Sequence, residues 1–148
     1  MTRPQKPNFL FIQTDQMTAF ALSYYGNPVV KTPNLDKLAA RGVVFQNAYC
    51  NNPICASSRF SMMSGQLSSR VGAYDNAAEF ASSIPTYAHH LRRAGYQTCL
   101  SGKMHFVGPD QLHGFEERAL LSVCYLQRFS SGTPQNPCKS DANLTHSS

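Results

Sequence analysis

The sequence predicts an α/β fold in which a parallel sheet is flanked by helices. Three features favour this fold: a continuous apolar run at residues 8–12, an alternation of strand-like and helix-like segments behind it, and glycines that end the helix-like segments. An uninterrupted apolar run is typical of a strand buried on both faces, the usual environment in parallel sheets. The 148 residues, of which 42% are hydrophobic and 14% charged, are enough for one globular domain.

The expected elements alternate along the chain. Residues 8–15 are typical of a strand, and Asp15 places an acid at its carboxyl end. A helix is expected at 32–42, because Pro33 suits its first turn and Gly42 can stop it. Four further elements are expected in chain order: a strand at 43–49, a helix at 55–65, a helix at 85–94 and a strand at 96–100. This order favours parallel strands joined by helices.

Composition limits the expected partners. The net charge of +5 comes from 13 Lys and Arg against 8 Asp and Glu, and the basic residues are spread along the chain, so no nucleic-acid partner is expected. The apolar runs are too short for a secretory leader or a membrane span, so no membrane partner is expected and the protein is predicted to be cytoplasmic. Five cysteines without regular spacing fit reduced thiols.

The composition changes after Glu117. Residues 130–137 and 141–148 are rich in Ser, Pro, Asn and Thr and have no apolar period. Such segments cannot bury enough apolar surface to offset the entropy of ordering them. We therefore expect a folded part at 1–118 and a divergent, poorly ordered tail at 119–148.

Cys55 is the residue with the most chemical alternatives. It begins an expected helix, where free N–H groups favour an anion, and Arg59 follows one turn later. A cysteine that only packs in the core is one alternative. A zinc site with Cys50 lacks a complete ligand set at a familiar spacing. A thiolate phosphatase needs a wider gap between its cysteine and arginine, so that a loop of N–H groups can close between them.

Residues 55–59, Cys-Ala-Ser-Ser-Arg, resemble the Cys-x-Pro-x-Arg signature of the type I sulfatases, in which the cysteine is oxidised to formylglycine. Two further elements of that family occur in the same order: Asp15 at the end of the first expected strand, and Gly-Lys-Met-His at 102–105. Residues 72–118 are also similar to bacterial choline-sulfatases. The sequence thus resembles the N-terminal part of a formylglycine sulfatase.

The resemblance implies an alkaline-phosphatase-like sulfatase fold, of which this chain would hold the N-terminal part. It implies a sulfuric ester hydrolase that converts choline sulfate and water to choline and sulfate, after a formylglycine-generating enzyme has oxidised Cys55. The family further implies Ca²⁺, or Mg²⁺ or Mn²⁺, held by Asp15 and by the residue made from Cys55, with Gln16 in place of a second acid. Full-length relatives are expected to be homo-oligomers.

The resemblance also implies roles for four more side chains. Arg59 would hold the formylglycine hydroxyl and the metal-site carboxylates. Lys103 would bind a sulfuryl oxygen and the leaving oxygen, and His105 would hydrogen-bond the formylglycine hydroxyl. All three would act as preorganised polar groups around the sulfuryl charge. Asn76 is either a substrate contact or a turn residue.

The sequence departs from the family pattern at one position of the signature. Ser57 stands where the family has Pro or Ala, so inefficient conversion of Cys55 is expected. His89 and His90 are expected to be structural, and His113 has no expected role.

The family draws further metal ligands, a second Lys and a second His from downstream segments, which are missing from this sequence. A gene fragment or a shifted reading frame is therefore the expected origin of residues 119–148. Two functional alternatives remain: a catalytically inactive fragment that at most binds anions, and a phosphonate or phosphate monoester hydrolase of the same superfamily.

Overall fold

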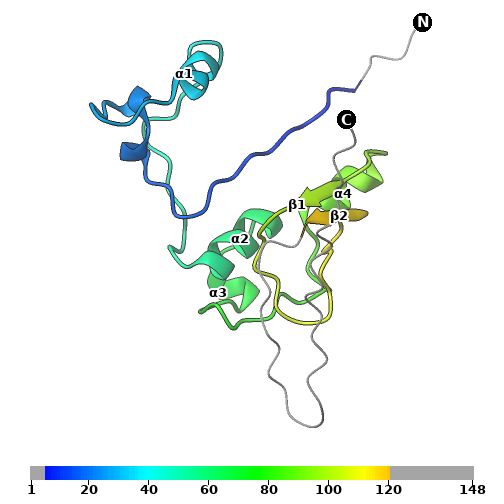
Figure 1. Ribbon diagram of the computed structural model, residues 1–148. Helices are drawn as coiled ribbons and strands as arrows, with labels where there is room; N and C mark the ends of the chain where they lie inside the picture. Colours follow the sequence, from blue (N-terminus) through cyan, green and yellow to red (C-terminus); the bar gives the residue numbers. More distant parts are fainter. Residues whose placement is uncertain (1–5, 121–148) are drawn as a thin grey trace, which may run out of the picture. The chain divides into compact units, whose positions relative to one another are not determined.

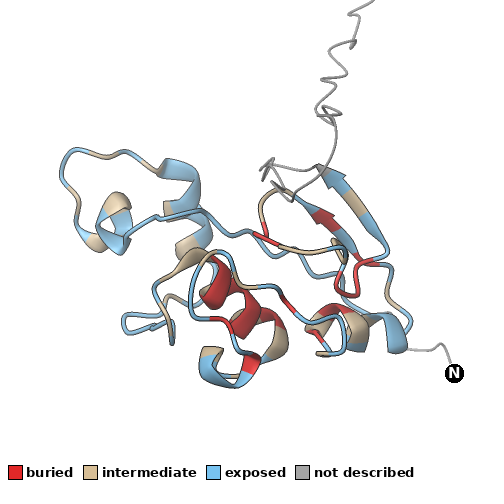
Figure 2. Cartoon of the chain, turned by 90° about the horizontal axis from the view of Figure 1, so that it is seen from below, coloured by how far each residue is buried: buried red, intermediate tan, exposed pale blue. Residues whose placement is uncertain are grey.

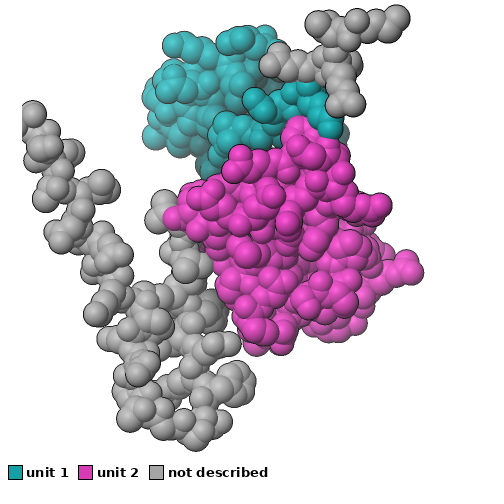
Figure 3. All heavy atoms as spheres, turned by 90° about the vertical axis from the view of Figure 1, so that its right-hand side faces the viewer, with its two compact units in different colours: residues 1–48 teal, residues 49–148 magenta. Residues whose placement is uncertain are grey.

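The computed structural model describes residues 6–120 (Figure 1). The chain divides into two compact units, residues 1–48 and 49–148, which Figure 3 colours separately. All but the first two residues of the tail expected at 119–148 lie outside the described residues. The domain boundary at 118 stays a prediction, and strand β2 (Glu117–Leu120) runs across it.

In its described residues, 6–48, the first unit contains two short 3-10 turns and one helix: η1 (Ala19–Ala21), η2 (Ser23–Tyr25) and α1 (Pro33–Ala39). The helix expected at 32–42 is thereby confirmed, with Pro33 in its first turn. A polar cluster closes the loop between η2 and α1. Ser23 Oγ lies 2.6 Å from Thr32 Oγ1 and 2.7 Å from Asp36 Oδ2. The start of α1 is therefore fixed by local polar contacts.

The predictions of a strand at 8–15 and of a strand at 43–49 are wrong. Neither segment has strand pairing, and the apolar side chains of the first one are exposed: Leu10 to 86% and Phe11 to 65%. A strand is stable when neighbours pair with its backbone and cover its apolar side chains. Among the described residues, neither segment is paired as a strand, and most of the apolar side chains at 8–12 stay exposed.

The second unit carries three helices and two strands among its described residues: α2 (Cys55–Ser64), α3 (Ser68–Val71), α4 (Tyr87–Arg93), β1 (Cys99–Ser101) and β2. The helices expected at 55–65 and 85–94 are confirmed. Gly65 and Gly95 follow them with φ of 67° and 83°, the left-handed conformation that favours glycine at a helix end. The strand expected at 96–100 begins three residues later, at Cys99.

Strands β1 and β2 form a two-stranded parallel sheet, in which Cys99 lies opposite Glu117 and Leu100 lies opposite Arg118. Parallel neighbours need a long crossover connection, and residues 102–116 provide it as a loop. This loop starts at the carboxyl end of β1. Loops at this end of a parallel sheet are where α/β proteins collect functional side chains.

The apolar core lies in the second unit (Figure 2). Helix α2 supplies Ala56, Phe60 and Met63, each no more than 1% exposed. The Phe60 ring stacks on Phe80 and Phe106, with ring centroids 4.6 and 6.3 Å away. The core thus joins α2 to the loop after β1, and this contact positions the site described next.

Candidate active site

Cys55 is the first residue of α2 and has a half-buried, free thiol. The turn before it is closed by Asn52, whose Oδ1 accepts a hydrogen bond from Ile54 N–H at 3.0 Å. Ala56 N–H is a first-turn donor with no partner inside the helix, and it donates to Asn76 Oδ1 at 3.1 Å. A residue from outside α2 therefore caps the turn that carries Cys55.

Arg59 lies one turn further along α2 and is only 5% exposed. Its Nη1 donates to the main-chain oxygen of Lys103 at 2.7 Å and lies 3.9 Å from Met104 Sδ. A buried charge is costly unless it is hydrogen-bonded, so this contact is a requirement of the burial. It ties α2 to the loop after β1.

His105 has an unusual backbone conformation. Its φ is 62°, in the left-handed region that residues with a Cβ rarely adopt, and it is 7% exposed. Such strain persists only where the surroundings fix it. Here the ring Nε2 lies 3.1 Å from the main-chain oxygen of Asn76. His105 is therefore held beside the turn that caps α2.

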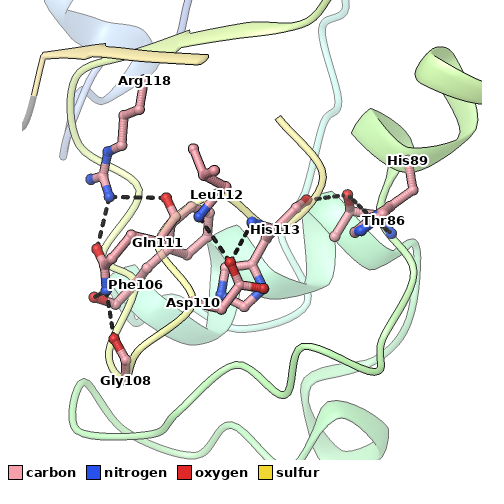
Figure 4. Close-up of polar contacts among 9 residues, drawn as sticks. All are labelled: Thr86, His89, Phe106, Gly108, Asp110, Gln111, Leu112, His113 and Arg118. Atoms are coloured by element: carbon pink, nitrogen blue, oxygen red, sulfur yellow. Dashed lines mark hydrogen bonds and ion pairs between the residues drawn. The ribbon is translucent and has the colours of Figure 1, made fainter. Parts of the chain in front are cut away.

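His113 is a buried residue of the loop after β1 and is drawn in Figure 4. Its ring packs against those of Phe80 and Phe106, with centroids 4.6 and 4.4 Å away. Burial lowers the pKa of His113, although Asp110 Oδ2 lies 3.4 Å from Nδ1 and opposes the shift. The Nδ1 contact lacks hydrogen-bond geometry, which fits a neutral ring better than an ion pair.

Asp110 closes the turn that leads into His113. Burial by itself would raise the pKa of Asp110, but the main-chain N–H groups of His113 and Leu112 donate to Oδ1, each at 3.0 Å, and the pKa is lowered. Gln111 extends this network, since Nε2 donates to Gly108 O at 2.8 Å and Oε1 accepts from Arg118 Nη1 at 2.8 Å (Figure 4). Side chains of the loop and of β2 thus fix the loop that carries Lys103 and His105.

His89 of α4 has the structural role that the sequence predicted, whereas the same prediction for His90 stays a prediction. His89 Nδ1 accepts a hydrogen bond from Thr86 N–H at 3.1 Å and so caps the helix start, whereas His90 is exposed. Thr86 Oγ1 in turn donates to the main-chain oxygen of His113 at 2.7 Å (Figure 4). Helix α4 is thereby attached to the same loop.

The second unit therefore brings together the segments that carry five of the expected site residues. The contacts run from α2 to the Asn76 turn and to the loop after β1. A helix N-terminus, a buried guanidinium and an imidazole at one place suit an anionic group. The five residues are Cys55, Arg59, Asn76, Lys103 and His105.

A family model described as Sulfatase matches residues 7–145 of the chain. The chain belongs to the sulfatase family. It is similar to the choline-sulfatase of Rhizobium meliloti (strain 1021), with 60% identity over 118 residues that make up 80% of this chain and 23% of that relative. It is also similar to the N-acetylgalactosamine-6-sulfatase of Homo sapiens, with 37% identity over 77% of this chain and 25% of that protein. The chain thus spans about a quarter of the length of these curated sulfatases.

Solved structures agree with this family and confirm the expected α/β, alkaline-phosphatase-like sulfatase fold. One is a protein in complex with its substrate D-glucosamine-2-N,6-O-disulfate, with a TM-score of 0.72, 37% identity, and coverage of 77% of this chain and 23% of that one. Another is the phosphonate monoester hydrolase of Agrobacterium radiobacter, with a TM-score of 0.63, 27% identity, and coverage of 72% and 24%. The likeness to the second protein keeps phosphonate ester chemistry among the alternatives.

The described part of this sulfatase chain does not fit a complete metal site. Within residues 6–120, no three His, Cys, Asp or Glu side chains lie close enough together to hold a metal ion. A Ca²⁺ ion takes about six to eight oxygen ligands, so Asp15 and Cys55 would be only part of a shell. Asp15 and Gln16 are exposed residues of the first unit, and their place beside Cys55 stays a prediction.

Two serines of α2 are buried. Ser57 and Ser61 are at most 5% exposed, which was not expected from the sequence. The apolar spacing of Phe60 and Met63 was the signal that could have predicted this burial.

In the described part of the chain, no helix has the length and apolar character that crossing a bilayer requires.

Proposed function

We propose that this chain carries the nucleophile-bearing part of a sulfuric ester hydrolase, which converts choline sulfate and water to choline and sulfate. The observation that carries the proposal is the meeting of three segments at the start of α2. They are the 55–59 motif, the turn of Asn76 and the Lys103–His105 loop. The 60% identity to a choline-sulfatase supports choline sulfate as the substrate.

Each side chain has a proposed role in the reaction. Cys55 is the site of formylglycine formation, and the hydrate of that aldehyde would supply a hydroxyl nucleophile for sulfur. Arg59 holds this hydroxyl, and its anchoring on the Lys103 main chain supports a fixed orientation of the guanidinium fork. Lys103 binds a sulfuryl oxygen and the leaving oxygen. His105 hydrogen-bonds the hydroxyl, which favours removal of its proton.

Asn76 is proposed to contact the substrate through its amide nitrogen. Its carboxamide oxygen is already engaged by Ala56 N–H, so the NH₂ group is the end that can donate to a sulfuryl oxygen. The turn itself is held by Asp75, whose Oδ1 accepts a hydrogen bond from Ala77 N–H at 2.9 Å. Turn chemistry and substrate contact are therefore compatible at this residue.

The cofactors and partners follow from the same proposal. A formylglycine-generating enzyme would modify Cys55, and Ca²⁺, or Mg²⁺ or Mn²⁺, would bind Asp15 and the modified residue together with ligands from outside residues 6–120. The free thiols of Cys50, Cys55 and Cys99 support a reducing compartment such as the cytoplasm. Homo-oligomers of the full-length sulfatases remain part of the proposal.

The test combines a mass measurement with an assay. The 148-residue chain is coexpressed with a formylglycine-generating enzyme, and the mass of the peptide that contains Cys55 reports the conversion. Modified chain is then given choline sulfate and Ca²⁺, and sulfate release is measured. Slow release is expected from the modified chain, because part of the metal shell lies outside residues 6–120; it should be unchanged in Cys99→Ala and absent in Cys55→Ala. A fully modified chain that releases no sulfate contradicts the proposal for this chain and favours an inactive fragment.

A second function is favoured by the likeness to the phosphonate monoester hydrolase. Phosphonate and sulfate esters both present a tetrahedral anionic group, which the same helix start and cations would hold. The modified chain is therefore also assayed with a phosphonate monoester and a phosphate monoester. Faster turnover of either compound than of choline sulfate would transfer the proposal to that substrate class.

A further inference from the structure

Asn76 joins two parts of the candidate site through two different atoms. Its side-chain Oδ1 accepts a hydrogen bond from Ala56 N–H at 3.1 Å, and its main-chain oxygen lies 3.1 Å from His105 Nε2. Ala56 directly follows Cys55 in the first turn of α2. One residue of a turn therefore holds both the helix start that carries Cys55 and the imidazole of His105.

These two contacts determine where the hydrogen atoms lie. A main-chain N–H can only donate, so the oxygen of the Asn76 carboxamide must face Ala56. A main-chain carbonyl can only accept, so His105 Nε2 must carry a hydrogen atom. In neutral His105, the ring lone pair is then on Nδ1.

We propose that Asn76 is a positioning residue that orders the first turn of α2 and holds His105 in the tautomer whose Nδ1 accepts a proton. The proposal rests on the proposed function for the identity of the proton donor, the hydroxyl of the modified Cys55. His105 Nδ1 takes the proton of this O–H bond, and the bonding electron pair stays on the oxygen. The ring then carries a positive charge, while Nε2–H still donates to the Asn76 carbonyl, a charge-assisted hydrogen bond that stabilises this form. The electron pair of the oxygen forms the new O–S bond, the S–O bond to choline breaks, and the proton passes from Nδ1 to the choline oxygen, which leaves as the alcohol.

The backbone of His105 supports this assignment. Its φ of 62° is costly for a residue with a Cβ, and the costly conformation brings Nε2 to the Asn76 carbonyl. A histidine that only filled space could keep an ordinary backbone. The strain is thus matched by a hydrogen bond that selects one tautomer.

The first test is spectroscopic and needs no activity. The 148-residue chain is labelled with ¹⁵N-histidine, and the ring signals of His105 are assigned by their loss in His105→Gln. At a pH where His105 is neutral, Nε2 is expected to have the shift of a protonated ring nitrogen and Nδ1 that of a bare one. A hydrogen atom on Nδ1 in the wild-type chain overturns the proposal, and this result does not depend on any variant folding.

The second test uses variants of the same turn. Asn76→Ala removes the acceptor for Ala56 N–H, so the turn is no longer fixed to α2. Its main-chain oxygen can then move away from His105 Nε2, and a mixture of His105 tautomers is expected. Asn76→Asp keeps an acceptor oxygen and is expected to restore the wild-type spectrum. Tyr74→Phe removes an exposed hydrogen bond to the main-chain oxygen of Ser69 just before the turn and serves as the matched control. A wild-type tautomer ratio in Asn76→Ala, or an equal disturbance in Tyr74→Phe, overturns the positioning role.

Kinetics separate positioning from substrate contact. Asn76→Ala is expected to lower kcat by about tenfold or more, the scale of misplaced catalytic groups. Asn76→Asp is expected to regain most of kcat, but to keep a raised KM because it lacks the NH₂ donor and adds a negative charge. Equal kcat values in Asn76→Ala and wild type contradict the proposal. If the wild-type chain releases no sulfate, the proposed function fails, and the tautomer measurement alone decides the role of Asn76.

Discussion

Arg59 and Lys103 are joined by a hydrogen bond of 2.7 Å from the guanidinium Nη1 to a main-chain oxygen. The guanidinium is almost fully buried, and the two residues belong to α2 and to the loop after β1. This contact couples the motif that contains Cys55 to the motif that contains His105. Its loss should therefore be measurable both as stability and as turnover.

Arg59→Lys is expected to lower the free energy of unfolding by about 1.5–3 kcal/mol, the range for hydrogen bonds to charged groups. Lysine keeps the charge but lacks the rigid fork of donors that reaches the loop. Urea unfolding of the 148-residue chain measures the change. Arg70→Lys, on the exposed surface of α3, is the matched control, and equal stabilities of the two variants would contradict the prediction.

In fully modified chain, Arg59→Lys is also expected to lower turnover of choline sulfate by about two orders of magnitude or more, as when one preorganised donor is removed. The content of formylglycine must be measured in the same sample, because Arg59 belongs to the signature that the modifying enzyme reads. Near-normal turnover by a fully modified variant would show that Arg59 serves maturation alone.

His113 gives the stability a predicted pH dependence. Burial lowers its pKa below the ordinary value of 6.5, so the folded chain binds this proton less readily than the unfolded chain. The stability contributed by the neutral ring is therefore complete above about pH 6.5 and is lost as the pH falls from there toward the lower folded pKa. Urea unfolding between pH 7.5 and about 5 measures the slope.

The control for this prediction is a variant that cannot titrate in that range. His113→Phe keeps an aromatic ring against Phe80 and Phe106 and is expected to flatten the slope, whereas His90→Gln on the exposed face of α4 is expected to keep it. If His113→Phe shows the wild-type slope, another group causes the pH dependence.

The helices were predictable because their signals are local. Pro33 in a first turn and Gly65 at a helix end act within a few residues, and both features are present in the structure. The apolar run at 8–12 carries a different kind of signal, since a strand needs partners from distant parts of the sequence. In the described residues this run is not paired as a strand, and its apolar side chains are exposed.

The candidate site also has residues that the sequence could predict and contacts that it could not. The resemblance to sulfatases pointed to Arg59, Lys103 and His105, and the structure brings their segments together. The hydrogen bonds of Asn76 to residues 20 and 29 positions away could not be predicted, because they depend on how three segments pack. The positive φ of His105 also follows from that packing and has no signature in the sequence.

Gln111→Glu is expected to destabilise the loop after β1. Gln111 Nε2 donates to two main-chain oxygens, those of Gly108 and Phe106, and a carboxylate would instead face them as an acceptor. Unpaired acceptors at this half-buried position should cost about 1–3 kcal/mol of unfolding free energy. Gln111→Ala removes the same donors without adding a charge, but it also removes the acceptor of Arg118 Nη1, which the carboxylate would keep and charge. Because two carbonyl oxygens face the carboxylate and one guanidinium N–H opposes them, Gln111→Ala should still cost less. A smaller loss of unfolding free energy in Gln111→Glu than in Gln111→Ala, measured in urea, would contradict the prediction and show that the ion pair with Arg118 outweighs the repulsion.

Gly114→Ala is expected to be among the costlier small substitutions, because two effects add. The φ of Gly114 is +95°, a conformation that costs a residue with a Cβ about 1–2 kcal/mol, and an added Cβ would lie 2.5 Å from His89 Nδ1. Gly72 isolates the first effect, since its φ is +79° and an added Cβ would meet no atom within 4 Å. The crowding at Gly114 should therefore add about 1–3 kcal/mol to the loss that Gly72→Ala suffers.

Two measurements, one of global stability and one of local hydrogen exchange, separate the cost of the positive φ from the cost of crowding at His89. Urea unfolding gives the free energies of both variants, and amide hydrogen exchange at Thr86 reports the hydrogen bond to His89. Because the added methyl group displaces the His89 ring, Thr86 N–H should exchange faster in Gly114→Ala and at the wild-type rate in Gly72→Ala. Equal losses of stability with unchanged exchange at Thr86 would mean that the ring moves aside freely, and the tight contact between the loop and α4 would then contribute nothing to stability.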